Sequence, residues 1–169
     1  MNTITFENTK YPAFQATGNA ARFALPFAEE IIGFGKVGYD IGCMKKEWSY
    51  PNSILIDVNI EDPWDAYSLP STPVDYIFSS HCLEHLPDWV GALDYWNTKL
   101  KTGGILFLYL PHKSQKYWNP WNNRKHYHMF SSSQFIKYFK SKQTIWKNTF
   151  VTKGHDLNNS FYCVAEKCG

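Results

Sequence analysis

Apolar residues along the chain gather into short runs that predict alternating strands and helices. Residues 36–42, 53–59 and 74–80 read as strands, and the poor alternation of 53–59 predicts burial on both faces. Residues 87–100 carry apolar side chains at helical spacing, and 104–111 form a continuous apolar run typical of a central buried strand. This order of strand, strand, strand, helix and strand indicates an α/β domain with a parallel sheet.

The segments on either side of this core predict covering elements. Residues 20–33 are apolar but contain Pro26, which we expect to break the helix, leaving one or two helical turns. Serines at N-capping positions begin a predicted helix over 131–142. Residues 144–152 and 160–167 then predict two antiparallel strands at the end of the sheet.

The length of 169 residues fits one domain. Hydrophobic residues make up 44% and aromatic residues 18%, which excludes a disordered chain. No apolar run approaches the roughly 20 residues of a membrane span, and the N-terminus lacks an apolar signal region, so we expect a cytoplasmic protein without a membrane partner. We divide the domain into a covering segment (1–33), a core (36–111), a loop (112–130) and a C-terminal helix and hairpin (131–169).

Charge and cysteine content refine this picture. Residues 1–98 hold 13 acidic and 5 basic side chains, whereas 99–169 hold 2 acidic and 12 basic ones. This asymmetry leaves open an anionic partner such as nucleic acid, and solvated lysines are the alternative interpretation. The four cysteines show no C-x-x-C pairing, and we expect them to be reduced and structural.

Candidate binding residues close the first two predicted strands. In an open parallel sheet, ligands bind outside the carboxyl ends of the strands. The first strand ends in Asp40-Ile41-Gly42-Cys43, and glycine in such a turn lets a ligand approach the backbone. Asp57 follows 17 residues after Asp40, where a carboxylate accepts the two hydroxyls of a ribose. The alternative is an ordinary strand end with a solvated aspartate.

The motifs in this region resemble those of class I S-adenosylmethionine-dependent methyltransferases, over about 36–130. The likeness is strongest to a branch with D-I-G-C-G, a V-D-Y-V-x-S-S-H-V-L-E-H-L block and L-K-P-G-G. It implies a three-layer Rossmann-like fold, with a mostly parallel sheet and an antiparallel C-terminal strand pair, and S-adenosylmethionine as cofactor. The motifs here are G-Y-D-I-G-C, I-L-I-D-V, W-D-A-Y-S-L-P, V-D-Y-I-F-S-S-H-C-L-E-H-L and L-K-T-G-G-I-L-F-L-Y-L-P-H.

The resemblance also implies roles for individual residues. Asp40 and Gly42, in the turn that includes Cys43, would face the methionine moiety, and Asp57 would hold the ribose. The positions that contact adenine in the family are Asp65 and Ala66, and those on the sulfonium side are Ser79, Ser80 and His81.

The sequence departs from the family after D-I-G-C. Met44 stands where relatives usually carry glycine, and only ten residues, 43–52, precede the second strand. The first helix is therefore expected to be short or absent. A degenerate, non-catalytic methyltransferase-like protein that binds a partner through its basic C-terminal half is the alternative function.

Histidines supply the candidate catalytic groups. His81, Glu84 and His85 are spaced i, i+3 and i+4, so a helix would place them on one face, where His126 or His128 could complete a Zn²⁺, Mn²⁺ or Fe²⁺ site. Some O-methyltransferases of small-RNA 3′ ends and of ubiquinone synthesis carry a similar face. The interpretation that we prefer is a Glu and His pair hydrogen-bonded without metal. The candidate general bases are then His81, His85 and His112.

The loop over 112–130 predicts the acceptor side, because connections of 19 residues are uncommon unless functional. Its aromatic and basic residues either stack on a sugar or base, or form a packed lid over the cofactor. We expect methyl transfer to an oxygen or nitrogen of a small-molecule or glycan acceptor, with a saccharide hydroxyl as the specific guess by analogy with methyltransferases of surface-glycan genes. The residues concerned are Lys116, Tyr117, Trp118, Trp121, Arg124, Lys125 and Tyr127.

Overall fold

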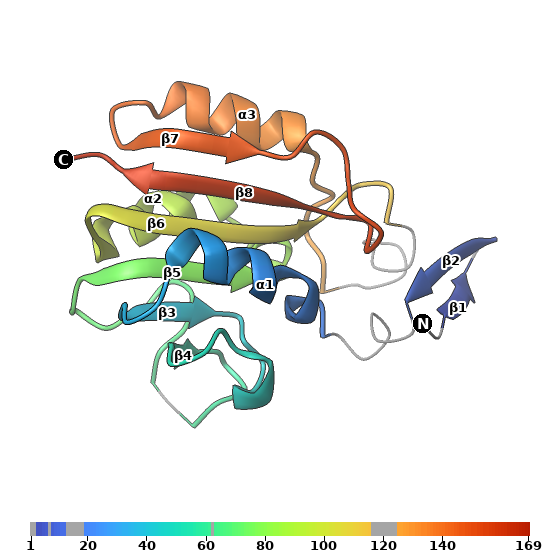
Figure 1. Ribbon diagram of the computed structural model, residues 1–169, viewed down its shortest axis with the longest axis horizontal. Helices are drawn as coiled ribbons and strands as arrows, with labels where there is room; N and C mark the ends of the chain where they lie inside the picture. The colour runs from blue at the N-terminus through green and yellow to red at the C-terminus, as the bar shows by residue number, and fades with distance from the viewer. Residues whose placement is uncertain (1–2, 7, 13–18, 62, 116–124) are drawn as a thin grey trace.

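The computed structural model describes residues 3–6, 8–12, 19–61, 63–115 and 125–169 (Figure 1). Its main feature is a six-stranded sheet with strand order β4-β3-β5-β6-β8-β7. The strands are β3 (Gly38–Ile41), β4 (Ile54–Ile56), β5 (Val74–Ser80), β6 (Leu100–Pro111), β7 (Trp146–Val151) and β8 (Ser160–Lys167).

The pairing within this sheet is parallel in one half and antiparallel in the other. Strand β3 pairs in parallel with β4 and β5, and β5 pairs in parallel with β6. Strand β8 is antiparallel to both β6 and β7. The predicted parallel core with an antiparallel C-terminal pair is therefore confirmed, and the observed bounds of β5 and β8 equal those expected from the apolar pattern.

Helices cover both faces of the sheet, which gives three layers (Figure 1). Helix α1 (Ala21–Ile32) packs on the face where β5 and β6 present aromatic rings, among them Phe78 and Phe107. Helices α2 (Trp89–Lys99) and α3 (Ser132–Ser141) pack on the opposite, largely aliphatic face.

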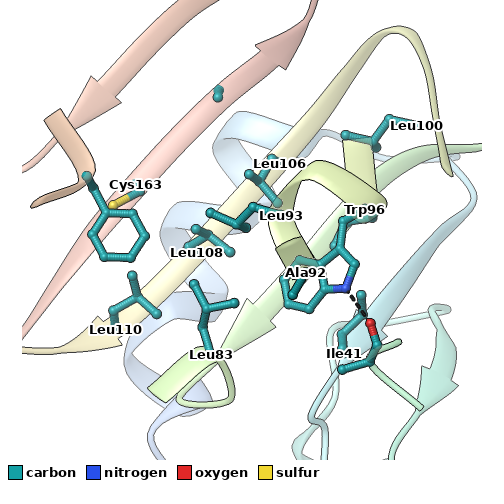
Figure 2. Close-up of a cluster of buried hydrophobic side chains, with 14 of the residues drawn as sticks. Ile41, Leu83, Ala92, Leu93, Trp96, Leu100, Leu106, Leu108, Leu110 and Cys163 are labelled. Atoms are coloured by element: carbon teal, nitrogen blue, oxygen red, sulfur yellow. Dashed lines mark hydrogen bonds between the residues drawn. The ribbon is translucent and has the colours of Figure 1, made fainter. Parts of the chain in front are cut away.

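Figure 2 shows part of this second face, where the indole of Trp96 is fully buried and donates a hydrogen bond of 2.7 Å to the carbonyl of Ala66. The alternation of side chains along β5 and β6 separates the two cores.

Helix α1 corrects the expectation that Pro26 breaks it. The helix runs unbroken for 12 residues, and Ala24, Ala28 and Ile32 lie buried on one side. Pro26 lies on the exposed side, together with Arg22, whose carbonyl has no helical donor at Pro26. Proline on this side does not disturb the buried residues, and burial of the opposite side maintains the helix.

Strand β4 corrects the expectation of burial on both faces. It forms the edge of the sheet, and of its three residues only Ile56 is buried, while Ile54 is exposed. The N-terminal segment also differs from a simple cover, because β1 (Thr3–Phe6) and β2 (Thr9–Pro12) form a separate two-stranded antiparallel hairpin.

The connection between β3 and β4 confirms that the first helix is nearly absent. It contains one 3₁₀ turn, η2 (Lys46–Trp48), in place of an α-helix. The ring of Tyr50 covers the sheet instead, with ring centroids 5.1 Å from Tyr76 and 5.4 Å from Phe78. A Cβ at Gly38 would collide with the ring of Tyr76, so this packing requires glycine there.

Among the described residues, no helix is both long and apolar enough to cross a membrane. The described cysteines are free, with Cys43 and Cys163 buried. The expectation of unpaired, structural cysteines agrees with this arrangement.

Candidate functional site

A cavity of about 910 Å³ opens at the carboxyl ends of β3, β4 and β5. The first residues of α1, the turn after β3, the segment after β4, the end of β5 and residues 125–127 line it. A cavity of this volume can hold a ligand larger than a single metabolite ring. The cavity lies where the open parallel sheet predicts a binding site.

The turn after β3 is held by a close approach to the end of β5. Gly42 has φ 83° and donates its N–H to the carbonyl of Ile56 at 2.8 Å. A Cβ at this position would meet the side chain of Cys82, and its φ lies in the left-handed region. Glycine is thus required here by both space and conformation, and its backbone remains open to the cavity.

Met44 keeps the backbone geometry that glycine favours. Its φ is 59°, and its N–H donates a hydrogen bond of 2.7 Å to Oδ2 of Asp57. Left-handed backbone costs a non-glycine residue about 1–2 kcal/mol, which gives a physical reason for glycine at this position in relatives. The turn therefore survives the substitution, with Met44 half exposed at the cavity.

Asp57 lies directly after β4 and is almost saturated with hydrogen bonds. Its Oδ1 accepts from the backbone and side-chain nitrogens of Asn59 at 2.8 and 2.6 Å, and its Oδ2 accepts from Met44. A carboxylate has about four lone-pair sites, so one acceptor position remains. Two ribose hydroxyls would bind only after the Asn59 side chain rotates away.

Asp40 is a buried carboxylate at the end of β3. It accepts a hydrogen bond of 2.7 Å from the N–H of Tyr50, and burial raises its pKa to about 8. A cationic ligand group beside it would favour the ionised form. The next cavity residue, Cys43, is uncharged, because burial raises the pKa of its thiol to about 12.

The adenine and sulfonium candidates separate into two groups. Ala66 and Ser80 line the cavity, and within the described structure Ser80 Oγ has no hydrogen-bond partner. Asp65 does not line it: its Oδ1 caps a local turn by accepting from the N–H of Tyr67 at 2.8 Å. Ser79 does not line it either, because it donates to the carbonyl of Ile41 across the sheet.

Glu84 forms the centre of the histidine-rich end. It is completely buried in the turn η3 (Leu83–His85), and neither carboxylate oxygen has a hydrogen-bond partner among the described residues. Its Oε1 lies 3.8 Å from Nδ1 of His81, 3.8 Å from Nε2 of His85 and 4.0 Å from Nε2 of His126. Burial raises the pKa of Glu84 to about 8.

His81 reaches this cluster through a strained turn, not through the expected helical face. Its φ is 51°, and its Nε2 lies 2.9 Å from Oγ of Ser160. Ser160 donates its proton to the carbonyl of Asn158, so His81 Nε2 must donate and Nδ1 keeps its lone pair. Burial, reinforced by the nearby imidazoles, lowers the pKa of His81 to about 3, so the ring is neutral at pH 7.

The other histidine candidates also separate into one that lines the cavity and two that do not. His85 lines the cavity, and its Nδ1 donates to the carbonyl of Lys125 at 2.8 Å, which leaves Nε2 as the acceptor. His128 does not line the cavity, and its Nε2 faces the carbonyls of Leu86 and Pro87. His112 also lies outside it, with Nδ1 2.9 Å from Oγ of Ser114.

Some cavity residues carry no motif that sequence reasoning could use. Trp48 and Tyr67 line the cavity from the segments after β3 and β4, and Ala20 and Ala21 line it from the start of α1. Within the predicted acceptor loop, Lys125 and Tyr127 line the cavity, but residues 116–124 lie outside the described part of the chain.

The polar groups at the two ends suit S-adenosylmethionine. One end offers the carboxylates of Asp40 and Asp57 to an ammonium group and a ribose, and the other offers oxygens of Ser80 and Glu84 that have no hydrogen-bond partner among the described residues. Buried polar atoms without partners are rare in folded proteins. The residues present therefore fit this cofactor.

The comparisons with solved structures agree with the fold. The chain superposes with a TM-score of 0.62 on the N-methyltransferase NodS from Bradyrhizobium japonicum, crystallised with S-adenosyl-L-homocysteine, at 15% identity over 92% of this chain and 88% of that one. It superposes with a TM-score of 0.66 on the 1,6-didemethyltoxoflavin-N1-methyltransferase of Burkholderia thailandensis, at 13% identity over 93% and 82%. A methyltransferase from Archaeoglobus fulgidus gives 0.61, at 14% identity over 92% and 100%.

The sequence comparisons give the family. No curated protein sequence matches the chain. The profile of the family described as methyltransferase domain matches residues 16–143, which span most of the chain and include the whole cavity. The chain therefore belongs to the methyltransferase domain family, among the class I S-adenosylmethionine-dependent methyltransferases.

Proposed function

We propose that this protein transfers a methyl group from S-adenosylmethionine to an oxygen or nitrogen of an acceptor that enters at the histidine-rich end of the cavity. The observation that carries the proposal is the continuity of one cavity from Asp40 and Asp57 to His81 and His85. A cofactor held at the first end would direct its reactive group toward the second.

The aspartate end is proposed to bind the cofactor. Asp57 accepts a ribose hydroxyl with its remaining lone pair, and Asp40 lies where a buried negative charge is stabilised by the methionine ammonium group. The neighbouring Gly42 exposes backbone to the ligand. These positions agree with the roles that the family resemblance implies for the same residues.

Methyl transfer requires the protein to align the acceptor with the methyl group and to accept a proton from the acceptor. When bound, the cofactor supplies a methyl group that is already activated by positive sulfur. The protein holds the acceptor in line with that group and accepts the proton that an attacking hydroxyl or amine loses. Residues 125–127 line the cavity at this end.

We assign the proton-accepting role to His81. Its Nδ1 lone pair is directed toward the cavity cluster, while Ser160 fixes the ring through Nε2. Its strained backbone is typical of functional positions. His85 lies in the same cluster, whereas His112 is separated from the cavity lining.

A saccharide hydroxyl is the proposed acceptor. Tyr127 is 62% exposed at the rim of the cavity, where an aromatic ring can stack on the apolar face of a sugar. Analogy with methyltransferases of surface-glycan genes also favours a saccharide. The basic C-terminal half is the feature that favours a nucleic acid instead.

A labelled-methyl assay tests this proposal. The protein is incubated with S-adenosylmethionine carrying a radioactive methyl group and with separate panels of saccharides, peptides and nucleic acids. Label in the saccharide fraction, with kcat reduced at least 100-fold and KM changed little in His81→Gln, is expected. Label only in nucleic acid would refute the saccharide. No label in any panel, from protein that still binds the cofactor, would favour the non-catalytic alternative.

A further inference from the structure

We propose that Glu84, His85 and His126 form a binding site for a divalent transition-metal ion, with Zn²⁺ as the preferred ion. The three side chains each place a ligand atom within 4.8 Å of the others. The cluster combines two imidazoles with one carboxylate, a donor set that suits Zn²⁺ and neighbouring transition metals better than Mg²⁺ or Ca²⁺.

The buried carboxylate is the first observation that supports an ion. Glu84 is fully buried, and neither of its oxygens has a hydrogen-bond partner in the described structure. The alternative suggested by the sequence, a Glu and His pair joined by a hydrogen bond, does not agree with distances of 3.8 to 4.0 Å from Oε1 to the imidazole nitrogens. A cation between these atoms would neutralise the carboxylate.

The spacing of the three atoms is the second observation. Ligand atoms that lie about 2.0–2.2 Å from one tetrahedral Zn²⁺ are about 3.3–3.5 Å from each other. The distances from Glu84 Oε1 to Nε2 of His85 and of His126, 3.8 and 4.0 Å, exceed this by about half an ångström. The ligand atoms of the two histidines lie within 4.8 Å of each other, so side-chain rotations bring the three atoms to coordination distance. The rings of His85 and His126 are perpendicular, with centroids 4.4 Å apart.

Hydrogen bonds hold the two segments of this cluster together. His85 donates from Nδ1 to the carbonyl of Lys125, which fixes the tautomer whose Nε2 can bind a metal. In return, the N–H groups of Tyr127 and His128 donate to the carbonyl of Glu84 at 2.8 and 3.3 Å. These three bonds place His126 opposite Glu84 without using any metal-binding atom.

Three protein ligands leave a coordination position open, as in catalytic zinc sites. The cluster lies at the cavity, so this position would take a water molecule or an acceptor hydroxyl. The second of these roles rests on the proposed methyl transfer, whereas binding of the ion itself does not.

The test is calorimetric titration of chelator-treated, metal-free protein with Zn²⁺, and in a parallel arm with Mg²⁺. We expect one Zn²⁺ per chain, binding at least 100-fold more tightly than Mg²⁺. Glu84→Gln and His126→Asn should each weaken Zn²⁺ binding at least 100-fold. The matched control His128→Gln, two residues from His126 and facing backbone carbonyls, should change it less than threefold.

Further measurements separate the outcomes. Zn²⁺ should raise the melting temperature of the wild type but not that of Glu84→Gln, whose fold is checked by circular dichroism without metal. Asp57→Ala should retain Zn²⁺ while losing S-adenosylhomocysteine, so failure of the cofactor site is distinguishable from failure of the metal site. No Zn²⁺ uptake by the wild type, or undiminished uptake by both cluster variants, would overturn the proposal.

Discussion

The two ends of the cavity differ in how their polar groups are satisfied. At the β3–β4 end, Asp40 and Asp57 accept hydrogen bonds from the protein's own backbone at 2.7 Å. At the β5 end, the described structure offers no hydrogen-bond partner to Ser80 Oγ or to either oxygen of Glu84. The first end is thus organised before any ligand binds, whereas the second requires a ligand to satisfy it.

This contrast separates substitutions that act on folding from substitutions that act on binding. Changes in the turn after β3 should alter stability, because its backbone geometry is part of the fold. Removal of the Glu84 carboxylate should leave stability of the ligand-free protein little affected, because no described residue forms a hydrogen bond with it. The predictions below test this division.

Gly42→Ala should have the largest effect. Its new Cβ would overlap the side chain of Cys82 and occupy a left-handed backbone, so we expect a loss of about 2–5 kcal/mol in the free energy of unfolding. Gly35→Ala is the matched control, with φ 74° and open space, and should cost only about 1 kcal/mol. Urea unfolding measures both, and equal losses would contradict the close packing of the turn.

Asp57→Ala should weaken binding of S-adenosylhomocysteine at least 100-fold, because it removes the ribose acceptor and releases Met44. Asp65→Ala should change the affinity less than threefold, since Asp65 caps a local turn and does not line the cavity. Calorimetry compares the two. A larger loss in Asp65→Ala would restore the adenine-binding role that the family motif implies for this residue.

Affinity for S-adenosylhomocysteine should rise with pH through the pKa of Asp40. Burial raises that pKa to about 8, so at pH 7 roughly one protein in ten carries the charge that the ligand ammonium requires. We expect affinity to increase about fivefold between pH 7 and pH 8, before deprotonation of the ligand ammonium group lowers it at higher pH. Asp40→Asn should remove this dependence; a wild-type affinity that is flat or falls over the same range would refute it.

Stability should show the opposite trend with pH, from the same group. The folded-state pKa of Asp40 lies above its ordinary value of 3.8, so between about pH 4 and pH 8 the folded state binds more protons than the unfolded state. The contribution of Asp40 to the free energy of unfolding therefore falls as pH rises through this window. Urea unfolding of the wild type and Asp40→Asn, compared across it, isolates this contribution.

Met44→Gly should have the smallest effect. It relieves left-handed strain at φ 59° and should stabilise the protein by about 1 kcal/mol, with the affinity for S-adenosylhomocysteine changed less than threefold. A gain in affinity above tenfold would mean that the methionine side chain obstructs the cavity. That result would favour the degenerate, non-catalytic alternative.

The sequence predicted the parallel core well, because its strands are apolar runs with distinct ends. It also predicted the short first connection, but not that Tyr50 would cover the sheet there, since one tyrosine leaves no periodic signal. The Pro26 prediction was wrong because a proline rule cannot tell which side of a helix faces water. The burial of β4 could not be predicted either, because β4 lies at the edge of the sheet and the periodicity of a strand carries no information about strand order.

The site was predictable where strand ends carry the chemistry and unpredictable where loops do. Asp40, Gly42 and Asp57 lie at or directly after the ends of β3 and β4, and the structure brings all three to the cavity. The sequence left His126 and His128 as alternatives for the metal candidate, because loop positions two residues apart differ only in side-chain direction. In the structure His126 faces Glu84, whereas His128 faces the carbonyls of Leu86 and Pro87.

The central claim is that one cofactor molecule binds at the aspartate end of this cavity. The most direct test is calorimetric titration of the wild-type protein with S-adenosylhomocysteine at pH 8. The account predicts a single site per chain. Absence of binding to folded protein at millimolar ligand would contradict it.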